Sequence, residues 1–400
     1  MGRSSAEGRL GAESVASVVQ TGDYFVVGNP VQPDRPCYIH RASEKALRQG
    51  IDDRRFCYVL SPKASGKTSL MAHTIRSLRE EGQLAAVVDL TQIAARGESA
   101  EAARWYYSIA YRILRELRLK FDLQSWWQEK SVIMNEQRFG DFFWEIVLAN
   151  TIAPITIFFD DIERAIGTPF AKELFSGFRF CYSGRVTEPD FSRLNFVVLG
   201  VATPRQLCPD MTTSPFEDGR SIELDDFSIE ETYQLAKGLG GESEQARSVL
   251  ERTYEWVGGQ PYLTQKIVRG VARRGGVPEQ VDRIVAEQFL GQSTTWEEPL
   301  LNHVRTLLTQ RTVRNRQALV LLRLIGRGAR LYHHSASVPQ QILRLAGVIT
   351  ARADGELTTR NKLFESAFTA RWISSVMAFN WRAAAVAAAV AAALIVVVVW

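Results

Sequence analysis

Cysteine is scarce in this sequence and is never paired along the chain. The four cysteines, Cys37, Cys57, Cys181 and Cys208, are scattered, and none belongs to a C-x-x-C pair. This spacing does not fit a disulfide framework, and both Cys57 and Cys181 stand in apolar surroundings. We therefore expect four reduced thiols in a cytosolic domain.

Other common signals are also missing. The first twenty residues lack the apolar core of a signal peptide. They are rich in Ser, Gly, Ala and charged residues, and we expect a disordered N-terminus over residues 1–23. We find no internal repeat. The net charge of +4 over 400 residues is small, and the composition is that of a folded globular protein with two or three domains.

The charge is unevenly distributed. Residues 303–372 hold eleven Arg and one Lys against three acidic residues, a local net charge of +9. Such a segment favours anionic lipid, and it also fits a DNA groove. We expect weak, salt-sensitive contacts with anionic surfaces, and we do not expect sequence-specific binding to nucleic acid.

One long hydrophobic run ends the sequence. No polar residue occurs from Ala383 to Trp400, and Trp381 and Trp400 bracket the run. A helix of this length measures roughly 28 Å, close to the hydrocarbon core of a bilayer. We expect a single transmembrane helix over residues 381–400, with the rest of the chain in the cytoplasm because basic residues precede the run. The alternative is a buried helix of a further domain, and we expect the full protein to continue beyond Trp400.

The most informative motif lies at residues 61–68, which read S-P-K-A-S-G-K-T. The phosphate-binding pattern is G-x-x-x-x-G-K-[ST], so Ser61 replaces the first glycine. The apolar run 56–60 predicts a buried strand before the loop, and residues 69–76 predict a helix after it. A helix N-terminus aims free N–H groups at an anion. We therefore expect Lys67 to reach the terminal phosphates and the Thr68 hydroxyl to bind Mg²⁺.

The whole loop is expected to contact the nucleotide, through Ser61, Pro62, Ala64, Ser65, Gly66, Lys67, Thr68 and Ser69. The alternative is an ordinary strand–turn–helix with an exposed lysine. If the loop needs a positive φ at Ser61, that residue costs about 1 kcal/mol, and nucleotide binding should survive the cost.

A pair of carboxylates completes the predicted site. The apolar strand 155–159 ends in Asp160-Asp161, where open α/β sheets bind ligands. We expect Asp160 to hold Mg²⁺ and Asp161 to polarise the attacking water. Asp161 is one methylene shorter than a Glu, so hydrolysis is expected to be slow. The alternative is that Asp161 only caps the helix that follows.

Strands alternate with helices over the first part of the chain, which predicts an α/β fold with a parallel sheet of about five strands. The expected strands are 56–60, 84–90, 155–159, 195–201 and 221–224. The aromatic residues of segment 99–150 have helical spacing and are expected in the core rather than on a base-stacking surface. We expect this nucleotide-binding core to comprise residues 24–226.

Helices dominate the remainder. Ser228 and Glu231 form a capping box, and a Gly-Gly-Gln-Pro stretch at 258–261 interrupts the helices. Asp354-Gly355 predicts a hairpin turn after further helices. We expect a helical lid at 227–298 and a winged-helix domain at 299–375.

Together these segments resemble the AAA-like STAND-type NTPases, a P-loop class of signalling ATPases. The likeness is greatest to bacterial AAA-like domain proteins that are often fused to WD or other repeats. It covers about Tyr24 to Trp372 and rests on the lead-in 24–38, the G-K-T loop, Asp89-Leu90-Thr91, the aspartate pair, residues 199–204 and the G-G-Q-P-Y-L-T-Q stretch.

The resemblance implies ATP and Mg²⁺ as ligands and gives roles to three further residues. Arg41 matches an arginine that precedes the core and lies near the base. Arg205 matches a sensor arginine for the terminal phosphate, and Pro261 matches the lid proline that closes on the nucleotide. In the alternatives, Arg41 is a surface charge, Arg205 pairs with a carboxylate, and Pro261 only starts a helix.

Three functions fit the sequence. The first is a membrane-anchored, slowly hydrolysing ATP switch, with Lys67, Asp161 and Arg205 as catalytic residues. The second is a DNA-binding winged-helix ATPase, and the third is a nucleotide-bound scaffold without hydrolysis. The sequence does not choose between a second copy of the chain and another protein as partner, and Arg185 is a candidate arginine finger.

Overall fold

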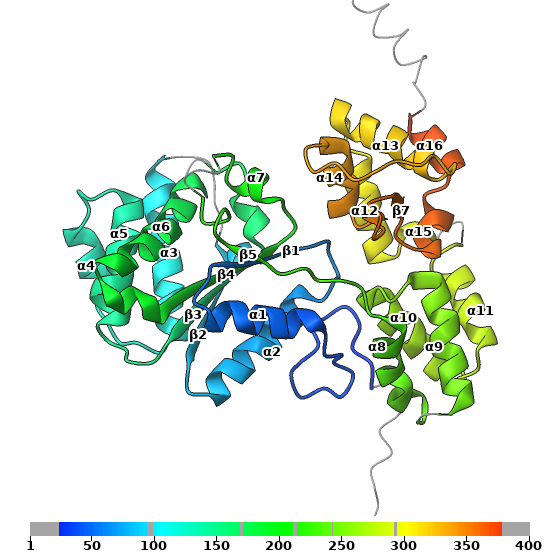
Figure 1. Cartoon of the computed structure of the whole chain (residues 1–400), viewed down its shortest axis with the longest axis horizontal. Coiled ribbons are helices and arrows are strands. Elements are labelled where there is room, and N and C mark those ends of the chain that lie inside the picture. Colours follow the sequence, from blue (N-terminus) through cyan, green and yellow to red (C-terminus); the bar gives the residue numbers. More distant parts are fainter. Residues whose placement is uncertain are drawn as a thin grey trace, which may run out of the picture.

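The computed structural model describes residues 24–93, 99–168, 171–210, 214–241, 243–291 and 294–377. Figure 1 shows three parts: an α/β core on the left, a group of helices at the lower right and a mixed C-terminal part at the upper right. The chain passes through them in that order, so each part is one continuous stretch apart from the lead-in at the N-terminus.

A five-stranded parallel sheet forms the centre of the core, in the order β2-β3-β4-β1-β5. Every residue of β3 and β4 is buried, because helices cover both faces of the sheet. The parallel sheet predicted from the sequence is confirmed. The predicted fifth strand, 221–224, is shifted and shorter: Arg220 and Ser221 pair with β1, so only Ser221 of the predicted range belongs to it. The strands are β1 Cys57–Leu60, β2 Leu84–Asp89, β3 Ile155–Asp160, β4 Leu194–Gly200 and β5 Arg220–Ser221.

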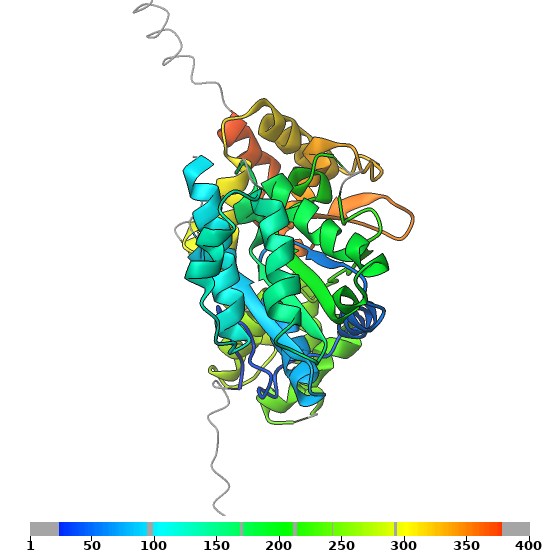
Figure 2. The ribbon, with the colours of Figure 1, turned by 90° about the vertical axis from the view of Figure 1, so that its left-hand side faces the viewer.

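Two sets of helices cover the sheet. Helices α1 (Ala42–Asp52) and α2 (Lys67–Glu80) pack on one face. The other face carries α3 (Ser99–Glu116), α4 (Leu123–Glu129), α5 (Asn135–Asp141), a π-helical turn and α6 (Ala171–Ser183), which stand in front in Figure 2. Their aromatic side chains fill the core as predicted: Trp105, Tyr106 and Trp127 are all buried. The four cysteines are buried and free.

The segment predicted as the lid, 227–298, is helical. Helices α8 (Ile229–Tyr233), α9 (Glu244–Val257), α10 (Pro261–Ala272) and α11 (Glu279–Gln288) form it. The predicted capping box is present, with Ser228 and Glu231 each bonding the other's backbone. The lead-in packs on the lid, because Phe25, Cys37 and Ile39 share a core with it.

The C-terminal part has the helices and hairpin of the predicted winged helix. Its elements are α12 (Pro299–Leu308), α13 (Val313–Ile325), α14 (Val338–Leu345), β6 (Ile349–Ala351), β7 (Leu357–Thr359), α15 (Lys362–Ala367) and α16 (Ala370–Met377). Strands β6 and β7 are antiparallel, and Gly355 takes a positive φ of 84° in the predicted turn between them.

None of the helices in the described ranges is long and apolar enough to cross a membrane. The run from Ala383 to Trp400, which the sequence predicts to do so, lies outside those ranges.

Candidate functional site

The phosphate loop lies between β1 and α2, as predicted, and the positive φ angle considered for Ser61 occurs at other residues of the loop. Positive φ angles occur at Ala64 (64°) and Gly66 (94°), and Ser61 is not among the positive-φ residues. Ser61 therefore carries no left-handed strain. Its hydroxyl lies 2.7 Å from that of Ser65, which donates to the Pro62 carbonyl. The serine at the first glycine position thus stabilises the loop through a hydrogen bond between its hydroxyl and that of Ser65.

Lys67 is the first residue of α2, and its side chain folds back under the loop. Its Nζ donates to the carbonyls of Ser61 (2.8 Å) and Pro62 (2.9 Å). Burial lowers the pKa of Lys67 to about 8, and the nearby carboxylates of Glu163, Asp160 and Asp161 oppose this shift. A buried ammonium at a helix N-terminus is a strong site for a phosphate, whose charge would restore the cationic form.

Thr68 and Asp160 come together as the sequence predicts for a magnesium site. The Thr68 hydroxyl donates to Asp160 Oδ2 over 3.1 Å. Burial, with Asp161 second, raises the pKa of Asp160 to about 6. A hydroxyl and a buried carboxylate beside the phosphate loop are the oxygen ligands that Mg²⁺ prefers, and the cation would remove the cost of burying the carboxylate.

Asp161 faces the same cavity from a strained backbone. Its φ is +53°, and its side chain makes no capping hydrogen bond to the short helical turn Ile162–Ala165. The alternative that Asp161 serves as a helix cap is therefore wrong. Burial raises its pKa, and the neighbouring Glu163 adds to the rise. A non-glycine residue held in this region is typical of functional sites.

Glu163 belongs to the site, and sequence reasoning missed it. Its Oε2 accepts a hydrogen bond from the Val201 amide over 2.9 Å, and its side chain lines the cavity. A Cβ added to Gly200 would lie 2.4 Å from the same oxygen, so the glycine at the end of β4 makes room for the carboxylate. The signal was available, because Glu163 follows the aspartate pair by two residues.

Arg41 joins the loop to the segment that leads into the lid. It donates to the carbonyls of Ser65 (3.1 Å) and Asp225 (3.0 Å), and its guanidinium lies over the Phe227 ring. Burial lowers its pKa. A Cβ on Gly66 would lie 2.7 Å from Arg41, so this glycine is needed for close approach as well as for its φ. Arg41 is therefore not a free surface charge.

Two other predicted arginines lie apart from this group. Arg205 is exposed on α7 (Pro204–Leu207) and does not line the cavity, so its sensor role stays a prediction. Arg185 donates to the carbonyls of Arg54, Phe191 and Leu194. Leu194 begins β4, whereas the phosphate loop lies at the other end of the sheet. These bonds make Arg185 a structural residue.

The lid touches the phosphate loop through a fully buried glutamine. Gln260 Nε2 donates to the carbonyl of Ala64 over 2.9 Å, and its Oε1 caps α10 by accepting from the Leu263 amide. Pro261 is the first residue of α10 and also lines the cavity. The helix-start position of Pro261 is confirmed, and its role in closing on the nucleotide stays a prediction. Gln260 was overlooked although it lies inside the predicted motif.

The C-terminal part also reaches the loop. A Cβ on Gly347, whose φ is +75°, would lie 3.0 Å from Pro62 Cβ. Arg360 forms a two-bond ion pair with Asp226, at 2.6 Å and 2.5 Å. The side-chain Nδ2 of Asn361 donates to the carbonyl of Val257 at the end of α9. Core, lid and winged helix therefore meet at one place.

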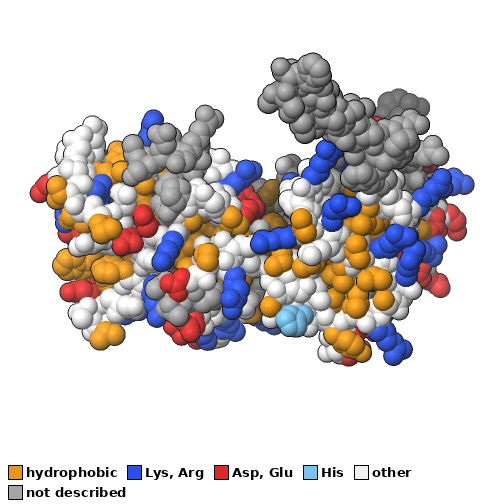
Figure 3. All heavy atoms as spheres, turned by 90° about the horizontal axis from the view of Figure 1, so that it is seen from above, with side chains coloured by type: hydrophobic (Ala, Val, Ile, Leu, Met, Phe, Trp, Pro, Cys, Tyr) orange, Lys and Arg blue, Asp and Glu red, His pale blue; other side chains and the backbone are white. Residues whose placement is uncertain are grey.

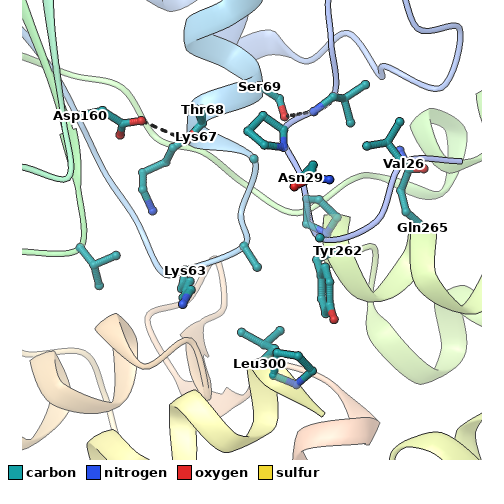
Figure 4. A pocket seen from close by; sticks show the side chains of 18 of the residues that line it. Val26, Asn29, Lys63, Lys67, Thr68, Ser69, Asp160, Tyr262, Gln265 and Leu300 are labelled. Carbon is teal, nitrogen blue, oxygen red and sulfur yellow. Dashed lines mark hydrogen bonds between the residues drawn. The ribbon is translucent and has the colours of Figure 1, made fainter. Parts of the chain in front are cut away.

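These parts enclose a cavity of about 770 Å³, a size suited to a small-molecule ligand. Figure 4 shows Lys67, Thr68 and Asp160 on one side, the lead-in near Val26 and Asn29 and the lid residues Tyr262 and Gln265 on another, and Leu300 of α12 below. Beyond these residues, the walls include Arg41, Lys63, Asp161, Glu163, Pro261, His303 and Leu307.

Comparisons with known proteins agree with this geometry. The AAA-like domain family matches residues 26–370. An uncharacterized WD repeat-containing protein of Synechocystis is 30% identical over 369 residues, which is 88% of this chain but 30% of the relative. The chain thus spans less than a third of that relative.

Solved structures share the fold. A Walker-type ATPase of Pyrococcus abyssi superposes with a TM-score of 0.56 at 14% identity, over 84% of this chain and 97% of that one. The Aeropyrum pernix ORC2 protein, solved as ADPNP–ADP complexes, gives 0.50 at 13% identity, over 90% and 99%. The C-terminal part of this chain resembles, in its fold, the winged-helix part of the ORC2 structure. With its phosphate loop and carboxylate pair in place, the chain belongs to the AAA-like domain family and is an ATP-binding P-loop NTPase.

Proposed function

We propose that this chain is a STAND-type signalling switch that binds ATP with Mg²⁺, hydrolyses it slowly and is tied to a membrane by residues 381–400. One observation carries the proposal: core, lid and winged helix line a single cavity. A ligand bound there contacts all three parts at once. When the bound nucleotide gains or loses a phosphate, the equilibrium between closed and open arrangements of the three parts therefore changes.

The phosphate loop is the point where this coupling would act. Gln260 of the lid bonds the Ala64 carbonyl, and Gly347 of the winged helix packs on Pro62. Ala64 has a positive φ, so its carbonyl has little freedom to follow a displaced partner. A loop reshaped by phosphate would move the lid contact and the winged-helix contact together.

Slow turnover follows from the groups beside the phosphates. Asp161 is short for a residue that positions water, and Arg205 does not line the cavity. A switch needs long-lived nucleotide states more than it needs a high rate. Adenine is the base we propose from the family likeness, lying between the lead-in and α10.

The surface of α13 supports contact with an anionic membrane. Val313, Val320 and Leu324, spaced seven and four residues apart, are exposed on one side of this helix. Arg316 of the same helix and Arg327, two residues after its end, are exposed as well. Figure 3 shows basic and hydrophobic side chains intermingled on the half that carries the winged helix. Basic and apolar groups together suit the interface of an anionic bilayer better than a DNA groove, where exposed aliphatic side chains gain little. The ATPase would then face the cytoplasm.

The test is nucleotide binding and turnover by matched variants. Lys67→Ala should lose measurable Mg·ATP affinity in calorimetry, because a charged hydrogen bond of about 1.5–3 kcal/mol disappears. Asp161→Asn should keep the affinity and lower the turnover number, since a water-positioning group acts in the transition state. Lys172→Ala, an exposed lysine on α6, is the control and should change neither.

Three results would overturn parts of the proposal. Equal ATP affinity in Lys67→Ala would move the binding site elsewhere. Unchanged turnover in Asp161→Asn would give its role to another residue, and no turnover in the unaltered chain would favour a scaffold without hydrolysis.

A further inference from the structure

A cluster of two histidines and one glutamate lies outside the phosphate site. His40 precedes α1, Glu44 lies in its first turn, and His73 lies in the second turn of α2. One nitrogen from each imidazole and one carboxylate oxygen lie within 4.8 Å of one another. His40 Nδ1 is 2.9 Å from Glu44 Oε2.

His73 has an unused buried nitrogen. Its Nε2 is buried and has no hydrogen-bond partner within the described part of the chain. Buried polar atoms almost always find a partner, so such an atom calls for an explanation.

A tyrosine orders two of the three side chains. The Tyr38 ring stacks flat on His73, with centroids 3.2 Å apart and planes 10° apart. Its hydroxyl donates to Glu44 Oε2 over 3.4 Å. An imidazole held by stacking and a carboxylate oriented by a hydrogen bond are typical of metal ligands, whose orientation is fixed by their neighbours.

We propose that His40, Glu44 and His73 form a binding site for a divalent transition-metal ion of the Zn²⁺ class. Two imidazoles and a carboxylate are a known ligand set for zinc, with water in the fourth position. Ligand atoms of a tetrahedral zinc ion lie about 3.3 Å apart, so the widest separation in the cluster, at most 4.8 Å, would shorten by up to about 1.5 Å. The exposed side chain of His40, with 70% of its surface accessible, has the freedom to supply that movement.

The ion would fasten the start of α1 to α2. Arg41, which bonds the Ser65 carbonyl of the phosphate loop, lies between His40 and Glu44 in the chain. Metal binding would therefore hold in place the arginine that braces the loop. The site itself needs no nucleotide and does not depend on hydrolysis.

The experiment titrates the full chain with Co²⁺ and Zn²⁺ without nucleotide and with excess Mg²⁺. Magnesium occupies oxygen sites such as Asp160 but competes poorly for imidazole. We expect one ion per chain by calorimetry and the visible absorption bands of tetrahedral cobalt. His73→Ala and the isosteric Glu44→Gln should each weaken binding by about 100-fold or more, because each removes a ligand.

The double variant His333→Ala/His334→Ala is the control, since it removes two exposed histidines elsewhere and should bind like the unaltered chain. Circular dichroism shows whether each variant is folded. If His73→Ala does not fold, the metal affinity of Glu44→Gln alone tests the proposal. The proposal fails if the unaltered chain binds no ion, if both ligand variants bind as well as it does, or if a thiolate–cobalt band assigns the ion to a cysteine.

Discussion

At the scale of single residues, the site holds charged groups where burial opposes their charge. Burial raises the pKa of Asp160 to about 6 and lowers that of Lys67 to about 8. In water both groups would be fully ionised at neutral pH. Burying these two charged groups therefore lowers the stability of the folded protein. A magnesium ion beside Asp160 and a phosphate beside Lys67 would offset that cost.

This conflict predicts a pH-dependent effect of Asp160→Asn. Because folding raises the pKa of Asp160 from 3.8 to about 6, its contribution to stability is full below pH 4 and is lost as the pH rises through 6. Without Mg²⁺ and nucleotide, Asp160→Asn should raise the free energy of unfolding at pH 8, by up to about 3 kcal/mol. At pH 4 the gain should vanish. Urea unfolding of the unaltered chain and of Asp160→Asn at both pH values measures the difference in the free energy of unfolding.

Asp218→Asn is the matched control, because that carboxylate is 86% exposed. It should change little at either pH. An equal gain from Asp160→Asn at pH 4 and pH 8 would show that the carboxylate is not the source of the effect.

At the scale of elements, the helix α10 connects the lid to the phosphate loop through its N-terminal cap. Gln260 is fully buried, and its two amide atoms serve different elements: one caps α10 and the other bonds Ala64. The position of α10 is thus tied to the shape of the loop.

Replacing Gln260 should weaken nucleotide binding without unfolding the chain. Gln260→Ala removes one hydrogen bond between lid and loop, worth about 1 kcal/mol, so Mg·ATP affinity should fall by about 5-fold. Calorimetry measures the change. Gln245→Ala, on the exposed side of α9, is the control and should bind ATP normally. Unaltered affinity in Gln260→Ala would mean that the contact does not influence the site.

The pair of Arg360 and Asp226 joins the hairpin of the winged helix to the segment before the lid. The two side chains are 10% and 18% exposed, so they are largely shielded from water. Arg360→Ala leaves the aspartate without its partner and should lower stability by about 3 kcal/mol. The midpoint of urea unfolding should fall accordingly.

Arg352→Ala provides the comparison, because Arg352 pairs with Glu356 but is 63% exposed. Exposed pairs contribute about 0–1 kcal/mol, so its midpoint should move much less. Equal shifts in the two variants would show that the first pair is no more important than a surface contact.

At the scale of the whole molecule, we expect the nucleotide site to form without the apolar run. Among the described residues, those that line the cavity belong to the segment from Val26 to Leu307. Deleting residues 381–400 should therefore leave a folded chain that binds ATP as before and no longer sediments with membranes at physiological salt. Fractionation of gently lysed cells, with calorimetry on the shortened chain, measures both. A shortened chain that unfolds would assign the run to a protein core.

The shortened chain should still bind anionic vesicles weakly through the winged helix. The charge of +9 over residues 303–372 gives the attraction, which salt screens over about 8 Å at physiological ionic strength. Co-sedimentation should fall steeply between low and physiological salt, and neutral vesicles should show none. Tight binding to one DNA duplex over a scrambled one would instead support the DNA-binding function.

The elements that local sequence governs were predictable. Strand and helix order, the phosphate loop, the capping box at Ser228 and the Asp354-Gly355 turn all follow from periodicity or from residues three or four positions apart. The positions of Lys67, Thr68 and Asp160 were predictable too, because parallel strands end at one edge of the sheet.

Only the tertiary structure decided how the three parts meet. The bond from Gln260 to the Ala64 carbonyl joins residues 196 positions apart, and the Arg360–Asp226 pair spans 134. A backbone carbonyl has no residue type, so no sequence pattern marks it as an acceptor. The strain at Ala64 and Asp161, in place of Ser61, likewise depends on how the packed sheet directs the chain into the site. Sequence alone therefore determined the chemistry of the loop, and packing determined which lid and winged-helix residues close over it.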